Sequence, residues 1–122
     1  MPIDKDFVAY VRELLAPLGP VSVKRMFGGA GVYLDEVIFA ILSDDTLYFR
    51  ADEHTEPAFR DAGSEPFVYT ARDEKQVSLG YWRAPDDAME GPDECEPWAR
   101  LGYEAALRKR AEKGAKGRKR KG

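Results

Sequence analysis

The residues best suited to chemistry are an arginine and a run of glycines, Arg25-Met26-Phe27-Gly28-Gly29-Ala30-Gly31. A guanidinium beside exposed backbone amides could hold a small anion, because both donate hydrogen bonds to oxygen. Phosphate cradles, however, need G-x-G-x-x-G or G-x-x-x-x-G-K-[ST] and a following helix. Neither spacing is present, and the next residues are typical of a strand. We therefore favour a bulged turn between antiparallel strands over an anion site at the Gly28–Gly31 turn, and an ion pair with a carboxylate for Arg25.

Two aromatic residues, Tyr81 and Trp82, end another predicted strand and could stack on a ligand or a base. Aromatic residues in such places more often complete the hydrophobic core, and we favour that interpretation. With Arg25, Gly28 and Gly29, they are the candidate residues for binding a ligand or a partner.

Candidates for catalysis are few. His54 is the single histidine, stands among acidic residues, and has no nucleophile at a motif spacing. The acidic pairs Asp44-Asp45 and Asp86-Asp87 fall in a predicted turn and at a predicted turn or helix start, where aspartate favours local hydrogen bonds over metal binding. One histidine and the single cysteine, Cys95, cannot form a zinc site. We expect a non-enzymatic protein with no catalytic residues, no metal and no cofactor. The alternative is a small-anion or ligand-binding protein, or an enzyme, that uses Arg25 and the Gly28–Gly31 turn.

The C-terminal end is strongly basic. Nine of the 19 Lys and Arg residues but one of the 22 Asp and Glu residues lie from Arg108 onward, which leaves 10 basic against 21 acidic residues before it. Clustered basic side chains bind phosphates without reading sequence, so this tail predicts weak, non-specific contact with nucleic acid. A solubilising end, or a tail that folds back on the acidic body, are the alternatives. The basic residues are Arg108, Lys109, Arg110, Lys113, Lys116, Arg118, Lys119, Arg120 and Lys121.

The length of 122 residues predicts one domain, over residues 1–107, followed by the basic extension 108–122. Its end, after Gly114, has no apolar face to bury and is expected to be disordered. The longest apolar run, Val37 to Leu42, is too short to span a bilayer, and the first residues do not resemble a signal peptide. We expect a cytoplasmic protein without a membrane partner.

Apolar periodicity predicts the elements that position these residues. Amphipathic spacing favours helices over 3–20, over 55–63 and from residue 93, where Gly102 would allow close packing despite its low helix propensity. Strands are predicted at 21–27, 32–34, 37–42, 46–50, 67–70 and 77–82. This order predicts an α+β fold, α-β(3-4)-α-β(2)-α, in two layers with helices packed on one face of an antiparallel sheet.

A set of motifs within residues 5–100 resembles one family. The Arg25-Met26-Phe27-Gly28-Gly29 block, with Gly31 and Tyr33, is followed by the Tyr81-Trp82-x-x-Pro85 block at a separation typical of the N-terminal domain of the TfoX/Sxy family. The resemblance implies a fold of the secretion-chaperone type, which is compatible with a homodimer. It also implies a regulatory role through protein–protein contact, since the regulators that name the family act on competence genes with the cyclic-AMP receptor protein. In those regulators a second domain follows, whereas the basic residues follow here.

Overall fold

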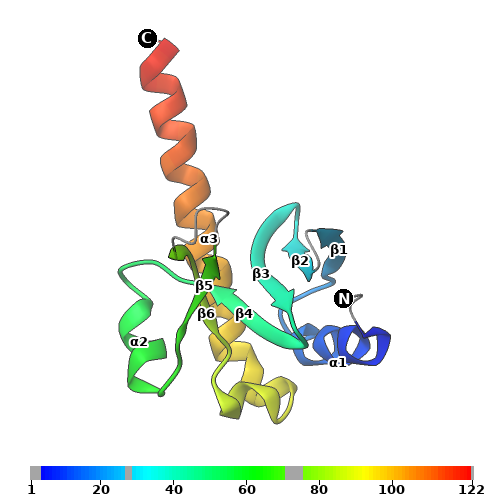
Figure 1. The fold of residues 1–122 in the computed structure, drawn as a ribbon. Coiled ribbons are helices and arrows are strands. Elements are labelled where there is room, and N and C mark those ends of the chain that lie inside the picture. The colour runs from blue at the N-terminus through cyan, green and yellow to red at the C-terminus, as the bar shows by residue number, and fades with distance from the viewer. Residues whose placement is uncertain (1–3, 27–28, 71–75, 122) are drawn as a thin grey trace.

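The computed structural model describes residues 4–26, 29–70 and 76–121 (Figure 1). Its elements follow the predicted α+β order, with four strands before the second helix and an additional short 3-10 helix. They are α1 (Lys5–Leu15), β1 (Ser22–Met26), β2 (Gly29–Leu34), β3 (Val37–Ser43), β4 (Thr46–Arg50), α2 (Glu56–Asp61), β5 (Pro66–Thr70), β6 (Gln76–Arg83), η1 (Asp86–Met89) and α3 (Pro92–Lys121).

One open antiparallel sheet holds all six strands in the order β1-β2-β3-β4-β6-β5. The first four strands form a meander, and β6 of the second hairpin pairs with β4, so that β1 and β5 are the edges. The predicted turn of the second hairpin, residues 72–75, lies outside the described residues. Pairing of β6 with β4 brings segments about 30 residues apart in sequence to the centre of the sheet.

Two-residue turns join β2 to β3 and β3 to β4. Asp35 and Glu36 have φ angles of 50° and 67°, and Asp44 and Asp45 have φ angles of 50° and 55°. Positive φ at both central residues is the pattern of a type I′ turn, whose twist matches that of the flanking strands. The predicted turn at Asp44-Asp45 is therefore confirmed, and this pair has a structural role.

A β-bulge interrupts β3. Ala40 lies opposite Val32, whereas Ile38 lies opposite Tyr33, so Phe39 is an extra residue without a partner. An extra residue breaks the strict alternation of faces along a strand. The bulge places the successive residues Phe39 and Ala40 among the buried residues of this strand, which also include Val37 and Leu42, whereas Ile38 and Ile41 are half-buried. The bulged turn favoured for the Gly28–Gly31 stretch is not found in its described part, because Gly29, Ala30 and Gly31 pair regularly with β1 at the start of β2. Phe27 and Gly28 lie outside the described residues.

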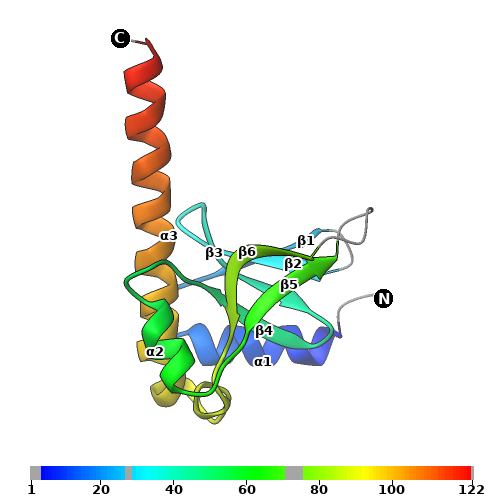
Figure 2. The same ribbon diagram turned by 60° about the vertical axis from the view of Figure 1, so that its left-hand side comes forward.

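The helices cover one face of the sheet and share one hydrophobic core with it. α3 packs across β3 and β4, and α1 packs against α3 (Figures 1 and 2). At this crossing Gly102 touches the sheet, because a Cβ atom there would lie 3.1 Å from Cβ of Phe49 and 3.3 Å from the carbonyl oxygen of Phe39. The prediction that Gly102 permits close packing is confirmed.

α3 continues past the body as a helix to Lys121 (Figure 1). A disordered end was expected here, and the structure differs. The packed turns of α3 supply the helical nucleus, after which each added residue gains a hydrogen bond, and Ala, Lys and Arg favour helix. No chain break separates residues 1–107 from the basic extension, since α3 runs through both. Within the described part of the chain, no helix combines the length and apolarity needed to cross a membrane.

Candidate functional site

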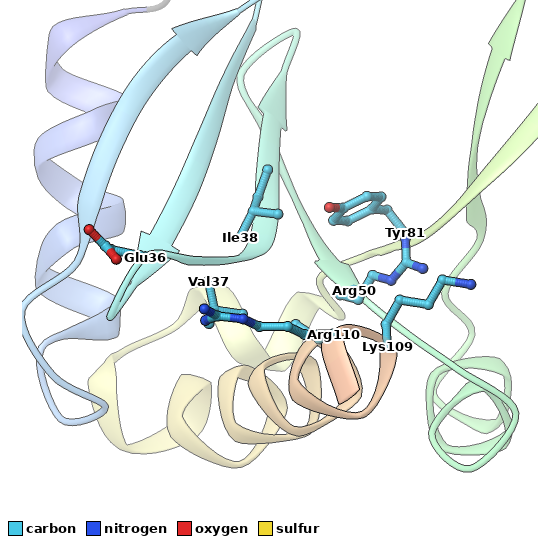
Figure 3. A pocket seen from close by; sticks show the side chains of 8 residues that line it. Glu36, Val37, Ile38, Arg50, Tyr81, Lys109 and Arg110 are labelled. Atoms are coloured by element: carbon cyan, nitrogen blue, oxygen red, sulfur yellow. The ribbon is translucent and has the colours of Figure 1, made fainter. Parts of the chain in front are cut away.

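A pocket lies where α3 leaves the sheet, and we call it the α3 pocket (Figure 3). Its volume is about 340 Å³. The strands contribute one cation and an aromatic ring, and the helix contributes two cations. The lining residues are Glu36, Val37, Ile38, Arg50, Tyr81, Ala106, Lys109 and Arg110.

The sheet side of the pocket is built by a cross-strand pair. Arg50 on β4 lies opposite Tyr81 on β6, and the Arg50 guanidinium carbon lies 5.3 Å from the centroid of the Tyr81 ring. Gly80 makes room for this guanidinium, because a Cβ atom at Gly80 would lie 3.0 Å from its Nη1 atom. Gly80 also has φ of +80°, which side chains rarely adopt. The Arg50 side chain is therefore held in place between β6 and an aromatic ring.

Tyr81 keeps its hydroxyl hydrogen in this setting. Burial raises the pKa of Tyr81, and the neighbouring Arg50 offsets only part of that rise. At neutral pH the phenol is thus uncharged and can donate a hydrogen bond. The sheet side of the pocket combines one positive charge with a neutral donor.

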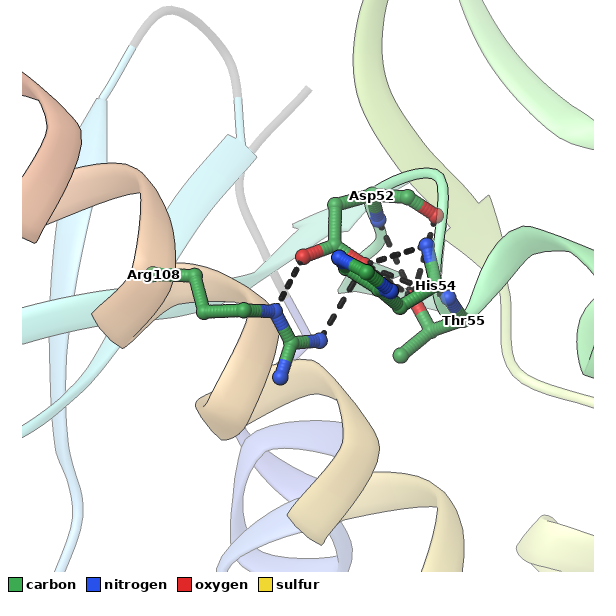
Figure 4. Close-up of polar contacts among 4 residues, drawn as sticks. All are labelled: Asp52, His54, Thr55 and Arg108. Carbon is green, nitrogen blue, oxygen red and sulfur yellow. Dashed lines mark hydrogen bonds and ion pairs between the residues drawn. The ribbon is translucent and has the colours of Figure 1, made fainter.

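Arg108 lies next to the pocket but is tied to the body (Figure 4). Its Nε and Nη2 atoms donate to Oδ2 and Oδ1 of Asp52 at 2.5 and 3.1 Å, a bidentate pair. Oδ1 of Asp52 also accepts the backbone N–H groups of His54 and Thr55 at 3.0 and 3.2 Å. Asp52 therefore organises the loop before α2 and anchors α3 to it. Among the residues described, neither Lys109 nor Arg110 forms an ion pair.

This anchor predicts a pH-dependent contribution to stability. The hydrogen bonds from Arg108 lower the pKa of Asp52, so its carboxylate stabilises the fold above the unfolded pKa of about 3.9, and the contribution is lost as pH falls through the lowered folded pKa. Both side chains are partly exposed, so we expect Asp52→Asn to reduce the free energy of unfolding by about 1 kcal/mol at pH 7.

Urea unfolding at neutral and strongly acidic pH measures this effect. The difference in free energy of unfolding between the parent protein and Asp52→Asn should become smaller at strongly acidic pH, because both proteins then carry an uncharged side chain at position 52. Arg100→Gln, which removes the exposed pair between Arg100 and Glu96, is the control and should change stability by less than about 0.5 kcal/mol. An equal loss from Asp52→Asn at both pH values would contradict the assignment.

The structure separates the predicted binding residues. Arg25 is exposed on edge strand β1 and Tyr81 lies on β6, with three strands between them, or about 19 Å along the sheet. Arg25 forms no ion pair with any described carboxylate, so the favoured ion pair is not found. Gly28 lies outside the described residues. An anion site at Arg25 stays a prediction.

Two other predicted residues have packing roles. Gly29 is buried, and a Cβ atom there would lie 2.2 Å from the carbonyl oxygen of Leu42, so the glycine permits close approach of β2 and β3. Trp82 is 7% exposed, lies with Phe59 in the core, and donates its indole N–H to Glu56 at 3.4 Å. Both residues of the pair are thus buried, as the favoured core interpretation expects, and Tyr81, which is 8% exposed, also lines the pocket.

Sequence reasoning missed Arg50, Ile38 and Gly80. One signal for Arg50 was its place on the same strand face as Tyr48, away from Leu47 and Phe49. A glycine within a predicted strand, directly before Tyr81, was a signal for close approach of another group. Neither signal by itself indicates that β4 and β6 are neighbours.

The remaining candidates show no reactive arrangement. The His54 side chain is exposed. Cys95 is fully buried, which raises the pKa of its thiol to about 12 and keeps it protonated. In residues 4–26, 29–70 and 76–121, no group of three His, Cys, Asp or Glu side chains could hold a metal ion.

Comparison with known proteins assigns this chain to a family. A family model described as the TfoX N-terminal domain matches residues 13–106, most of the chain. The chain belongs to the TfoX N-terminal domain family. It is 26% identical to Protein Sxy of Escherichia coli strain K12 over 102 residues, which cover 82% of the chain and 47% of that protein. It is also 26% identical to DNA transformation protein TfoX1 of Aliivibrio fischeri over 70 residues, or 57% of the chain and 32% of that protein. The chain thus spans less than half the length of either relative.

The α3 pocket straddles the end of the TfoX N-terminal match. Its lining residues from Glu36 to Ala106 lie within residues 13–106, whereas Lys109 and Arg110 lie beyond them. The anchoring cation Arg108 also lies beyond the match. The TfoX N-terminal domain therefore supplies the sheet side of the pocket, and the basic continuation of α3 supplies two of its cations.

Proposed function

We propose that this TfoX N-terminal domain is a non-enzymatic regulatory module that acts by contact with a protein partner, in transcription or competence regulation. The basic part of α3, residues 108–121, adds weak and non-specific contact with nucleic acid; we call it the basic arm. The protein is proposed to work in the cytoplasm. Neither relative's name describes an enzyme, and one is called a DNA transformation protein.

The observation that carries this proposal is the course of α3. The helix packs on the sheet near Gly102, is anchored by Arg108, and then extends beyond the body to Lys121 (Figure 2). At 1.5 Å per residue the basic arm is about 20 Å long. A helix of this length that carries many cations can follow a groove or a phosphate backbone, and neutralised phosphates release counterions.

Charge distribution supports a division of labour between the arm and the body. Residues 1–107 hold 21 acidic and 10 basic side chains, so the folded body repels a polyanion. Nucleic-acid contact would fall to the basic arm, and the body would be left for a protein partner.

The test is binding of a random-sequence DNA duplex across a salt series. The arm variant, Lys116→Gln/Arg118→Gln/Lys119→Gln/Arg120→Gln, removes four positive charges from the basic arm. The body variant, Lys5→Gln/Lys24→Gln/Arg60→Gln/Arg100→Gln, removes four exposed positive charges from the rest of the chain. Each phosphate contact contributes about −0.9 to the slope of log K against log salt.

We expect the parent to bind with a steep slope and the arm variant to reduce that slope by about 3 units. The body variant should leave the slope within about 1 unit of the parent. No binding by the parent, or equal slopes for the arm and body variants, would refute nucleic-acid contact through the arm. Protein contact by the folded body would then be the whole of the proposed mechanism.

A further inference from the structure

The α3 pocket has the size of a small-molecule site. Its volume of about 340 Å³ falls within the range of roughly 300–1,000 Å³ that is typical of ligand pockets. It is formed by separate elements, the β2–β3 turn, the central strands and α3 (Figure 3). A ligand in it would therefore contact both the sheet and the helix.

The charges in the pocket favour an anion. Arg50, Lys109 and Arg110 bring three positive charges to its lining, against the single carboxylate of Glu36. In Figure 3 this carboxylate lies at the opposite end of the pocket from Arg50 and Lys109. The Arg110 guanidinium is drawn beside Val37, away from Arg50 and Lys109 (Figure 3). Arg50 and Lys109 are therefore the two cations that would attract a phosphate on the Tyr81 side of the pocket.

Arg108 differs from the two cations that follow it on α3, because only Arg108 has an acidic partner among the described residues. Arg108 is clamped by Asp52, whereas the next two cations of α3 form no ion pair with a described residue and line the pocket. The anchor fixes where the helix backbone passes the sheet. It thereby fixes where Lys109 and Arg110 start, close to an Arg50 side chain that is already held against Tyr81 and Gly80. Arg50 is thus the pre-positioned cation of the pocket and loses less conformational freedom when it binds, whereas Lys109 and Arg110 keep exposed side chains.

The apolar part of the lining favours an organic anion over an inorganic ion. Val37, Ile38 and Ala106 supply aliphatic surface, and Tyr81 supplies a ring whose hydroxyl is drawn toward Ile38 (Figure 3). Ligand sites commonly combine such an apolar wall with a few polar groups that fix orientation. The pocket can thus hold a charged group at one end and an apolar or planar group beside it.

We propose that the α3 pocket binds a small phosphorylated metabolite, of about the size of a nucleoside monophosphate. Its phosphate accepts hydrogen bonds from Arg50 and Lys109, and its apolar or planar part lies against Ile38 and Tyr81. The ligand bridges the sheet and the base of the basic arm. This binding function is separate from nucleic-acid contact by the arm and does not depend on it.

The test uses the full chain and measures its melting temperature at constant ionic strength. The probes are adenosine monophosphate, cytidine monophosphate, pyridoxal phosphate and glucose 6-phosphate, each at millimolar concentration, with inorganic phosphate and adenosine for comparison. A ligand that binds the folded state alone raises the melting temperature. We expect at least one phosphomonoester to raise it by several degrees, with inorganic phosphate weaker and adenosine without effect.

Variants locate the binding. Lys109→Gln/Arg110→Gln should reduce at least tenfold the affinity for the probe that binds, as measured by calorimetry. Lys5→Gln/Arg100→Gln removes the same charge outside the pocket and should leave affinity unchanged. The arm variant described above should also leave it unchanged, which separates this proposal from the nucleic-acid proposal.

Several outcomes would overturn the inference. They are no shift with any phosphomonoester, an equal shift with adenosine, and equal weakening in both double variants. Loss of duplex binding in Lys109→Gln/Arg110→Gln without any response to the small probes would also overturn it. In that case the pocket cations belong to a surface for the nucleic-acid backbone.

Discussion

Replacement of Gly29 by alanine is expected to reduce the free energy of unfolding by about 3 kcal/mol or more. The added Cβ atom would lie 2.2 Å from the carbonyl oxygen of Leu42 and 3.4 Å from its carbonyl carbon. These are backbone atoms of the paired strand β3, so no side-chain rotation can relieve the clash. β2 and β3 would have to separate or shift in register at the start of the meander.

Urea unfolding of Gly29→Ala against the parent measures this loss. Gly63→Ala is the matched control, because a Cβ atom at Gly63 meets nothing within 4 Å although φ there is +81°. The control should show backbone strain alone, about 1–2 kcal/mol. If Gly29→Ala costs no more than Gly63→Ala, the close approach of the two strands is not the reason for the glycine.

The second large effect is expected at Phe49. This residue is fully buried on β4, lies opposite Ala40 and Trp82, and touches α3 at Gly102. Phe49→Ala should reduce the free energy of unfolding by about 3–5 kcal/mol, since it removes a buried ring and leaves a cavity between the sheet and α3. Val68→Ala, at a residue 43% exposed, should change it by less than about 0.5 kcal/mol.

A double-mutant cycle then isolates the contact between helix and sheet. Gly102→Ala alone adds an atom 3.1 Å from Cβ of Phe49, where packing is already tight. In the Phe49→Ala background the ring atom Cδ1 at 3.3 Å is gone, so the same substitution should cost somewhat less, although Cβ of residue 49 at 3.1 Å and the carbonyl oxygen of Phe39 at 3.3 Å remain. Additive effects would show that the Phe49 ring does not crowd position 102.

Local patterns in the sequence determined the elements of this domain. The spacing of Val11, Leu14 and Leu15, with Asp4 as N-cap, specified α1, and all three residues are fully buried. Alternating and β-branched segments specified the strands, and the acidic pairs Asp35-Glu36 and Asp44-Asp45 mark the tight turns. These signals depend on neighbours within a few residues, and for that reason they can be read from the chain itself.

Tertiary structure decided how those elements combine into a site. The pairing of β4 with β6 placed Arg50 opposite Tyr81, and the bulge at Phe39 set which residues of β3 face the helices. The course of α3 then brought Lys109 to the same pocket. Each of these contacts joins residues far apart in sequence, so it depends on strand order, register and helix packing, which no local periodicity encodes. The sequence determined the α+β elements, the acidic body and the basic C-terminal segment, whereas the pocket exists only in the folded chain.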